Sequence, residues 1–355
     1  FRAIKARVGE ALPWTDWPRQ YRSWTPELSE CSELRGNVER CCRVQYEFMR
    51  QWQSLHDYAR ARGILIIGDM PMYVSSDSAD VWSNPSLFEL DPEGRPSGLA
   101  GVPPDYFNSK GQLWGNPTYN WSELRREKYS WWMRRFQRMF ELYDYVRLDH
   151  FLGFSSYYSI PEGSTAEDGS WRFGAGLDLF SQAAKQFGHM PLIAEDLGAI
   201  TPAVRALIAE IGIPGMDVVQ FADEDVRRGY HPKPGKIVYT STHDTSTLLG
   251  WAARSFGETF SAEISSDVCS KVLCSSATVA IMSLQDVIGL GDEARMNTPG
   301  IAEGNWQWRA TDKQLEESAL RLANLAKKSD RFVSKTQLGQ AGDMLDSERA
   351  KSLNH

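Results

Sequence analysis

The sequence lacks the features that mark membrane and secreted proteins. No stretch reaches the roughly 18 consecutive apolar residues that a membrane-spanning helix needs, and the opening FRAIKARVGE has no apolar signal-peptide core. The five cysteines are odd in number and form no CxxC pair, which argues against a disulfide framework and a structural zinc site. We therefore expect a cytoplasmic protein that is not attached to a membrane.

Runs of positive charge are also missing. The formal net charge is −7, and no run of Lys or Arg is long enough to bind a polyanion, so nucleic acid is not an expected partner. The six histidines include no HxH or HxxxH pair, and no GxGxxG follows an apolar run. These absences predict a protein without a metal site and without a cofactor.

Aromatic residues, in contrast, are abundant, at 12% of a chain of 355 residues. A chain of this length buries about three quarters of its unfolded surface, so some of these rings must belong to the core. Others fall in segments rich in Gly and Pro, where rings can stack on the apolar faces of sugars. The segment 71–122 has this composition and is predicted to be a long functional loop.

Apolar runs alternate with amphipathic segments along the chain. The expected strands are 64–67, 145–149, 191–196, 215–221, 236–244 and 279–287. The expected helices are 38–62, 122–143, 176–187, 201–211, 246–256, 262–277 and 311–328. This alternation predicts parallel strands joined by crossover helices, in a sheet covered on both faces. We favour an α/β fold of the TIM (β/α)8 type with about six of the eight strands visible; a doubly wound sheet is the alternative.

The same pattern suggests a division of the chain. We expect residues 1–310 to form a partial catalytic barrel that includes a loop subdomain at 71–122. Residues 311–355 are expected to form a C-terminal helix and a polar tail, of which the charged end from residue 329 is weakly ordered.

Acidic residues end four of the expected strands. Asp69, Asp149, Glu195 with Asp196, and Asp244 each close an apolar run. In a parallel barrel these strand ends converge on one face, where TIM-barrel enzymes carry their active sites. Any one of them alone could equally be a helix cap, but four together predict a cluster of carboxylates.

A cluster of carboxylates suits the cleavage of glycosidic bonds with retention. One carboxylate attacks the anomeric carbon, and a protonated one about 5–5.5 Å away donates to the leaving oxygen. A neighbouring carboxylate raises the pKa of the acid in such a site. Arg147 projects to the same side of its strand as Asp149 and could hold it ionised and oriented. His243, beside Asp244, either bonds sugar hydroxyls or is structural.

Seven segments resemble the 4-α-glucanotransferase (amylomaltase) family and occur in that family's order. They are IIGDMPMYVSSDSADVW (66–82), GVPPDYFNSKGQLWGNPTYNW (101–121), VRLDHFLGF (146–154), IAEDLGAITPAV (193–204), GIPGMDVVQFA (212–222), THD (242–244) and RMNTPGIAEGNWQWR (295–309). The long GVPPDYF…GQLWGNP match is distinctive, whereas R-x-D or THD alone would be weak. The resemblance implies a barrel enzyme that transfers α-1,4-glucan segments between maltooligosaccharides or starch chains.

The resemblance also implies residue roles. Asp149 would be the nucleophile, Glu195 the general acid/base, and Asp244 the residue that binds and distorts the sugar at the scissile bond. The residues implied to contact or support the substrate are Asp69, Arg147 and His243 around that sugar, and Asp105, Tyr106, Phe107, Gln112, Trp114 and Asn116 on a loop over the acceptor groove.

Two departures from the family pattern are visible. Ser246 stands two residues after THD, where the family commonly has another acid. The resemblance also begins partway into the family's chain, without its first two strands. A fragment of a longer protein is therefore one expectation, and its sheet would have exposed edges.

Three other functions remain open. An α-glucan hydrolase would use the same acids and would raise reducing ends without lengthening chains. A glucan-binding fragment without activity would bind maltotriose and release no glucose. A metal-dependent hydrolase would use Asp149-His150 and His243-Asp244 as ligands and would lose its activity in EDTA.

Overall fold

The computed structural model describes the residues at 1–104, 110–198, 200–222, 226, 229–256, 262–301 and 303–331. These fall into two compact units, of which unit 1 comprises residues 1–195 and 200–213. Unit 2 comprises residues 196–198 and 214–331 as far as they are described. Within the described part of the chain, no helix is long and apolar enough to cross a membrane.

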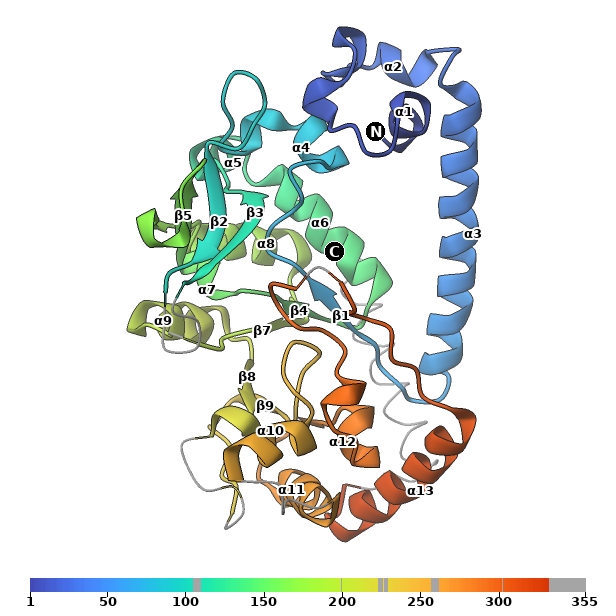
Figure 1. Cartoon of the computed structure of the whole chain (residues 1–355), viewed down its shortest axis with the longest axis vertical. Helices are drawn as coiled ribbons and strands as arrows, with labels where there is room; N and C mark the ends of the chain where they lie inside the picture. Colours follow the sequence, from blue (N-terminus) through green and yellow to red (C-terminus); the bar gives the residue numbers. More distant parts are fainter. Residues whose placement is uncertain are drawn as a thin grey trace. The chain divides into compact units, whose positions relative to one another are not determined.

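Unit 1 contains a parallel sheet. Its strands, in spatial order, are β1 (Ile67–Met70), β4 (Tyr145–Leu148) and β7 (Leu192–Ala194). Asp69 of β1 pairs with Arg147 of β4, which in turn pairs with Ile193 of β7. Helix α6 (Ser130–Leu142) packs on β1 and β4 (Figure 1). Because the three strands run in the same direction, their carboxyl ends lie along one edge of the sheet.

The other helices of unit 1 come before, between and after the strands of this sheet in the sequence. They are α1 (Arg2–Val8), α2 (Glu27–Glu30), α3 (Arg35–Arg60), α4 (Ala79–Ser83), α5 (Trp121–Arg126), α7 (Leu152–Ser155), α8 (Leu177–Phe187) and α9 (Pro202–Ile211). Helix α9 begins as expected, because the Thr201 hydroxyl accepts from the Val204 N–H and a proline occupies the first helical position.

Strand β1 begins three residues later than the strand predicted at 64–67. The Ile64 N–H donates to the Ala59 carbonyl at 3.0 Å, so this residue still closes the end of α3. The Ile66 N–H donates to the carboxylate of Asp144 at 2.9 Å. The first half of the apolar run therefore ends a helix, and the strand starts only at Ile67.

A turn of two left-handed residues divides the helix predicted at 122–143. Lys128 and Tyr129 have φ values of 56° and 57°, a region that few residues other than glycine adopt. The predicted helix therefore forms α5 and α6 as separate elements.

Unit 1 also has an antiparallel sheet that the sequence did not predict. Its strands, in spatial order, are β3 (Gln112–Pro117), β2 (Gly98–Val102), β5 (Ser156–Pro161) and β6 (Ser170–Phe173). Strands β2 and β3 lie within the segment predicted as a long loop. A Cβ atom on Gly101 would overlap the Gln112 carbonyl, so these strands need glycine where they approach each other. Such strands lack the β-branched alternation by which a strand is recognised.

Aromatic side chains fill the core of unit 1. Among the largest fully buried side chains are Trp17, Tyr119, Trp132, Phe136, Phe154 and Phe180. The rings meet edge to face in several places, as Trp132 and Phe154 do at 5.2 Å between centroids. Much of the aromatic excess in the sequence therefore belongs to the core.

The described residues of unit 2 contain three further parallel strands and four α-helices. The elements are β8 (Gly215–Val218), β9 (Lys236–Tyr239), β10 (Ala280–Ile281), α10 (Leu248–Phe256), α11 (Ala262–Cys274), α12 (Leu284–Ile288) and α13 (Asp312–Lys328). β9 pairs with both β8 and β10. Val238, Leu248, Val268 and Val272 are among the residues of its separate core.

The strand predicted at 279–287 is mostly wrong. Only Ala280 and Ile281 of this range form a strand, and α12 begins after Ser283, whose hydroxyl accepts from the Asp286 N–H. Serine at this position is a strong helix cap, and it overrides the apolar character of the run. The helix predicted at 311–328 is confirmed as α13, with a capping box of Thr311 and Gln314. Residues 332–355, which make up most of the polar tail predicted from residue 329, lie outside the described residues.

Candidate functional site

The predicted acids of unit 1 lie at the carboxyl ends of neighbouring strands. The Asp149 N–H donates to the Met70 carbonyl at 3.0 Å, and the Glu195 N–H donates to the Leu148 carbonyl at 3.0 Å. The parallel hydrogen-bond ladder thus continues one step past β4 and β7. Asp69, Asp149 and Glu195 are therefore gathered along one edge of the sheet, as the sequence predicted.

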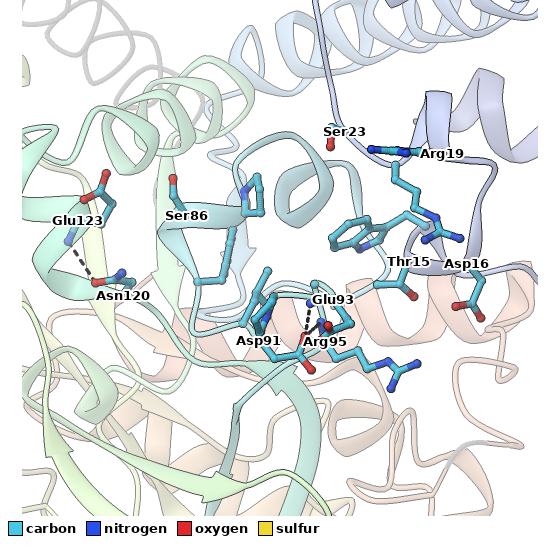
Figure 2. A pocket seen from close by; sticks show the side chains of 17 residues that line it. Thr15, Asp16, Arg19, Ser23, Ser86, Asp91, Glu93, Arg95, Asn120 and Glu123 are labelled. Carbon is cyan, nitrogen blue, oxygen red and sulfur yellow. Dashed lines mark hydrogen bonds between the residues drawn. The ribbon is translucent and has the colours of Figure 1, made fainter.

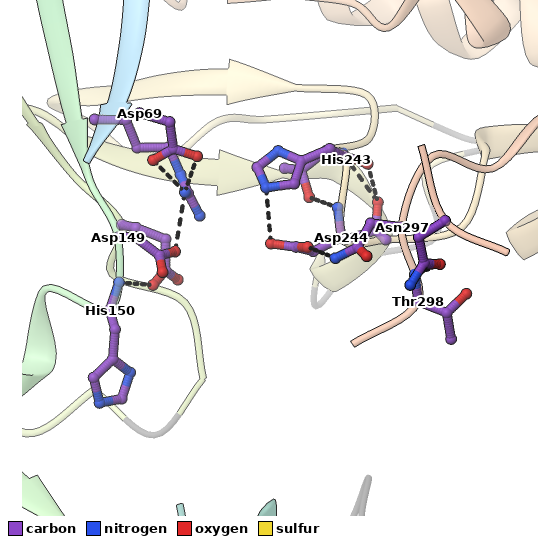
Figure 3. Close-up of polar contacts among 12 residues, drawn as sticks. Asp69, Asp149, His150, His243, Asp244, Asn297 and Thr298 are labelled. Atoms are coloured by element: carbon purple, nitrogen blue, oxygen red, sulfur yellow. Dashed lines mark hydrogen bonds and ion pairs between the residues drawn. The ribbon is translucent and has the colours of Figure 1, made fainter. Parts of the chain in front are cut away.

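Arg147 contacts two of these acids, Asp69 and Asp149. Its Nη1 donates to both carboxylate oxygens of Asp69, at 2.8 and 2.7 Å, and lies 3.0 Å from Oδ1 of Asp149 (Figure 3). Burial disfavours the charged guanidinium, but the charges of Asp69, Asp149 and Glu195 outweigh burial and raise the pKa of Arg147 above its ordinary value. The cation is therefore permanent, and it fixes the orientation of the Asp149 carboxylate.

The turn that follows Asp149 holds Glu195. The backbone N–H of His150 donates to Oε2 of Glu195 at 2.8 Å, and the next N–H, of Phe151, donates to the Glu195 carbonyl at 3.1 Å. His150 has a φ of 51°, in the left-handed region. The sequence named His150 only as a ligand in the metal-dependent alternative; its contact with Glu195 was not predicted, because it comes through the backbone, which no residue pattern reveals.

Three predicted acceptor residues, Gln112, Trp114 and Asn116, occupy every second position of β3 in unit 1. The Trp114 indole N–H donates to Oε1 of Gln112 at 3.0 Å, and the Asn116 amide donates to the Val74 carbonyl at 2.9 Å. The Trp114 ring meets the His150 ring edge-on, with centroids 4.8 Å apart. β3 is therefore joined directly to the turn after Asp149. The other predicted acceptor residues, Asp105, Tyr106 and Phe107, lie outside the described residues.

Unit 2 contains the third predicted catalytic acid, Asp244, on the loop that follows β9. Both carboxylate oxygens of Asp244 are engaged: the Asn297 amide donates to Oδ1 at 2.6 Å, and Nε2 of His243 lies 3.1 Å from Oδ2 (Figure 3). The Asn297 N–H donates to the His243 carbonyl at 3.0 Å, and Arg295 donates to the Asp244 carbonyl at 2.7 Å. The segment at 295–297 thus holds His243 and Asp244 in fixed positions relative to each other.

Asp286 anchors this loop from inside the core of unit 2. Its fully buried carboxylate accepts hydrogen bonds from the hydroxyls of Thr240 and Ser241, both at 2.6 Å, and from the Leu248 N–H at 2.7 Å. These donors stand on either side of His243 and Asp244 in the chain. Asp286 therefore fixes both ends of the loop.

Two of the residues noted in the sequence have structural roles. Ser246, which departs from the family pattern, is buried and accepts a hydrogen bond from Arg295 at 3.3 Å. Asp196, which follows Glu195, is buried in unit 2, where it accepts from the Met216 N–H at 2.8 Å and pairs with Lys236. Its carboxylate is thus engaged by the protein.

A cavity of about 1360 Å³ lies elsewhere in unit 1 (Figure 2). It is lined by residues of the segments 14–23, 85–95 and 120–123, such as Asp16, Arg19 and Arg95. It includes none of the predicted site residues. Within the described residues, no group of three or more His, Cys, Asp or Glu side chains is placed to hold a metal ion.

The family profile described as 4-alpha-glucanotransferase matches residues 1–315 of the chain. The chain belongs to the 4-α-glucanotransferase family. It is 43% identical to the 4-alpha-glucanotransferase of Thermus thermophilus over 358 aligned positions, which cover 94% of this chain and 71% of that one. It is 38% identical to a chloroplastic/amyloplastic 4-alpha-glucanotransferase of Arabidopsis thaliana, covering 91% of this chain and 58% of the relative.

A solved structure supports the fold. The chain resembles an amylomaltase from Streptococcus agalactiae in complex with acarbose, with a TM-score of 0.85 and 34% identity. The match covers 93% of this chain and 71% of that one. The predicted α/β fold of the TIM-barrel type, with six parallel strands, is confirmed by this similarity and by β1, β4, β7, β8, β9 and β10.

Several members of the site in this 4-α-glucanotransferase were missed in the sequence. Arg295 and Asn297 fall within the RMNTP run, which was matched to the family without roles for its residues. Asp286 was hidden in a segment predicted as a strand. Ser283 followed three positions later by Asp286 is typical of the start of a helix, and this spacing could have identified both α12 and its buried carboxylate.

Proposed function

We propose that this member of the 4-α-glucanotransferase family transfers α-1,4-glucan segments from one maltooligosaccharide or starch-type chain to another, with retention of configuration. The observation that carries the proposal is the placement of Asp149 and Glu195 at the ends of the adjacent parallel strands β4 and β7. Double displacement needs two carboxyl groups at one sugar, one as nucleophile and one as acid/base.

In the first half of the reaction, Asp149 attacks the anomeric carbon and Glu195 protonates the leaving oxygen. The bond from the anomeric carbon to the glycosidic oxygen breaks, and a β-glucosyl ester on Asp149 forms. Arg147 lies against Oδ1 of Asp149, which leaves Oδ2 as the attacking oxygen. The departing chain carries away the proton of Glu195.

In the second half, the 4-hydroxyl of an acceptor sugar replaces water as the nucleophile. Glu195, now ionised, takes the hydroxyl proton, the new glycosidic bond forms, and the ester bond to Asp149 breaks. We assign the acceptor to the side of β3, where Gln112, Trp114 and Asn116 alternate along the strand. Aromatic surface there favours a sugar over water.

Asp244 is proposed to bind hydroxyls of the sugar whose bond is cleaved. The contacts with His243 and Asn297 fix the directions of its two oxygens. Fixed acceptors can favour a distorted ring over the relaxed one, which contributes to the rate. Asp69 and Arg147 are proposed to contact the substrate beside Asp149.

Incubation with maltotriose tests the function. Transfer releases glucose and produces maltopentaose and longer chains, and Glu195→Gln should lower the rate by about 10²–10⁴. A rise in reducing ends without longer chains would indicate a hydrolase, and binding without products would indicate a glucan-binding protein. Activity that survives exhaustive EDTA treatment would exclude the metal-dependent alternative.

The domain division and the location are proposals of the same kind. We propose that residues 1–310 supply the catalytic part, with the segment 71–122 as a subdomain, and that 311–355 are accessory. The cytoplasm is the proposed location. The Arabidopsis relative is named as chloroplastic/amyloplastic, so cell fractionation with an antibody against the chain is the deciding measurement.

A further inference from the structure

The cavity of unit 1 is large and has polar side chains at both ends. Its volume of about 1360 Å³ exceeds the roughly 300–1,000 Å³ of pockets that hold one small molecule. Asp16 and Arg19 lie at one end of the space, Asn120 and Glu123 lie at the other, and Arg95 lies between them (Figure 2). A space of this size and length suits an extended ligand better than a compact one.

Several polar side chains of the lining are available to a ligand. Within the described part of the chain, four exposed charged side chains of the cavity form no hydrogen bond or ion pair: Asp16, Arg19, Glu93 and Arg95. The same is true of three hydroxyls of the lining, those of Thr15, Ser23 and Ser86. The cavity therefore offers donors and acceptors together.

The charges of the lining indicate the class of ligand. Three arginines stand against four acids, which leaves a net charge of −1. A site for phosphate or another anion would need an excess of positive charge. Donors and acceptors in nearly equal number instead match a neutral ligand with many hydroxyls, because each hydroxyl both donates and accepts. A sugar chain has this chemistry.

The wall that carries Glu93 and Arg95 is held in place by the protein. Oδ1 of Asp91 accepts hydrogen bonds from the N–H of Glu93 at 2.9 Å and from that of Arg95 at 2.8 Å. The buried ring of Trp14 lies against this turn, and a Cβ atom on Gly94 would overlap it. The wall is thus formed before a ligand binds, which lowers the entropic cost of binding.

The cavity adjoins the proposed acceptor side of the reaction. Asn120 of the lining follows Asn116, on β3, by four residues, and four residues span at most about 14 Å. The loop after β1 contacts both places: the Val74 carbonyl accepts from the Asn116 amide at 2.9 Å, and the Ser76 carbonyl accepts from the Trp14 indole at 2.8 Å. A glucan bound along β3 can therefore extend into the cavity.

We propose that this cavity binds the distal part of a long α-glucan acceptor. The proposal rests on the transferase function proposed above and adds a second glucan-binding region to it. A chain held at the cavity keeps its near end at a high effective concentration beside the catalytic acids. A short acceptor cannot reach both places and gains nothing from the cavity.

Acceptor length provides the kinetic test. With α-maltosyl fluoride as donor, mass spectrometry measures the rate at which maltose or maltoheptaose gains maltosyl units, as a function of acceptor concentration. In the double variant Arg19→Ala/Arg95→Ala, KM for maltoheptaose should rise about tenfold, and KM for maltose should stay within about twofold. The kcat values should not change, because the lost contacts bind the ground state and the transition state equally.

Arg134→Ala is the matched control for these kinetics. It also removes an exposed arginine of unit 1, but one that does not line the cavity. This variant should match the wild type with both acceptors. An equal rise of KM for maltose and maltoheptaose in the double variant, or wild-type values for both, would overturn the proposal.

Calorimetry tests the site without turnover. Asp149→Asn lacks the proposed nucleophile, so maltoheptaose should stay intact while its Kd is measured. Adding Arg19→Ala/Arg95→Ala to this background should raise the Kd of maltoheptaose about tenfold and leave that of maltose unchanged. An unchanged Kd for maltoheptaose would overturn the proposal. So would inorganic phosphate that weakens maltoheptaose binding only while both arginines are present, because it would indicate an anion site.

The two measurements distinguish failure of this proposal from failure of the proposed function. If the wild type transfers to neither acceptor while the cavity arginines still change the Kd of maltoheptaose, the proposed function is wrong and the glucan site stands. If the wild type transfers to both acceptors and the double variant keeps the wild-type KM for maltoheptaose, only the role of the cavity is refuted.

Discussion

Acidification should destabilise unit 1 through His150. Burial lowers the pKa of its imidazole from 6.5 to about 4, so the folded chain keeps the ring neutral where the unfolded chain already binds a proton. Between about pH 6.5 and pH 4 the unfolded state binds more protons, and the free energy of unfolding falls as the pH falls. At about 1.4 kcal/mol per pH unit, the full window is worth about 3 kcal/mol. The contribution is complete above about pH 6.5 and is lost as the pH approaches 4.

Urea unfolding at a series of pH values measures this effect. The wild type and His150→Asn share every other titrating group, so the difference between their pH profiles isolates the imidazole. Between about pH 7 and pH 4.5 the wild type should lose about 2 kcal/mol more than the variant. Parallel profiles would show that the ring is not held neutral in the fold, and the burial argument for His150 would fail.

Further predictions concern the residues that orient the acids. Asp286→Ala should lower the free energy of unfolding by about 2–4 kcal/mol, because three buried donors lose their acceptor; urea titration measures this, and a loss below about 1 kcal/mol would contradict it. Asn297→Ala should lower kcat/KM for maltotriose about tenfold, since Oδ1 of Asp244 loses its amide donor, and unchanged kinetics would refute that role. Arg147→Lys should cost more than tenfold in kcat, because an ammonium cannot reproduce the contacts of the guanidinium with Asp69 and Asp149; near-normal kcat would show that charge alone suffices.

The sequence predicted the parallel strands and the acids of the site for a physical reason. Buried parallel strands are apolar on both faces, so an acid directly after such a run is conspicuous. Asp69, Asp149 and Glu195 were found in this way, and they lie along one edge of the sheet of unit 1. Arg147 was placed beside Asp149 by the alternation of side chains along a strand, and the structure confirms that contact.

Other features left no signal in the residue pattern. The antiparallel sheet of β2, β3, β5 and β6 depends on glycines such as Gly98 and Gly101. These glycines give the segment the composition of a loop. The hold on Glu195 comes from a backbone N–H whose direction depends on one φ angle, at His150. The strand predicted through Asp286 failed because the Ser283 cap outweighed a short apolar run.

The most direct test of the account is to trap the sugar on the nucleophile. In Glu195→Gln, α-maltosyl fluoride can form the ester but no base activates an acceptor, so the intermediate should accumulate. Peptide mass spectrometry after rapid acid quenching should then find one maltosyl group, on Asp149. A label on any other residue, or none while fluoride is released at a normal rate, would contradict double displacement through Asp149.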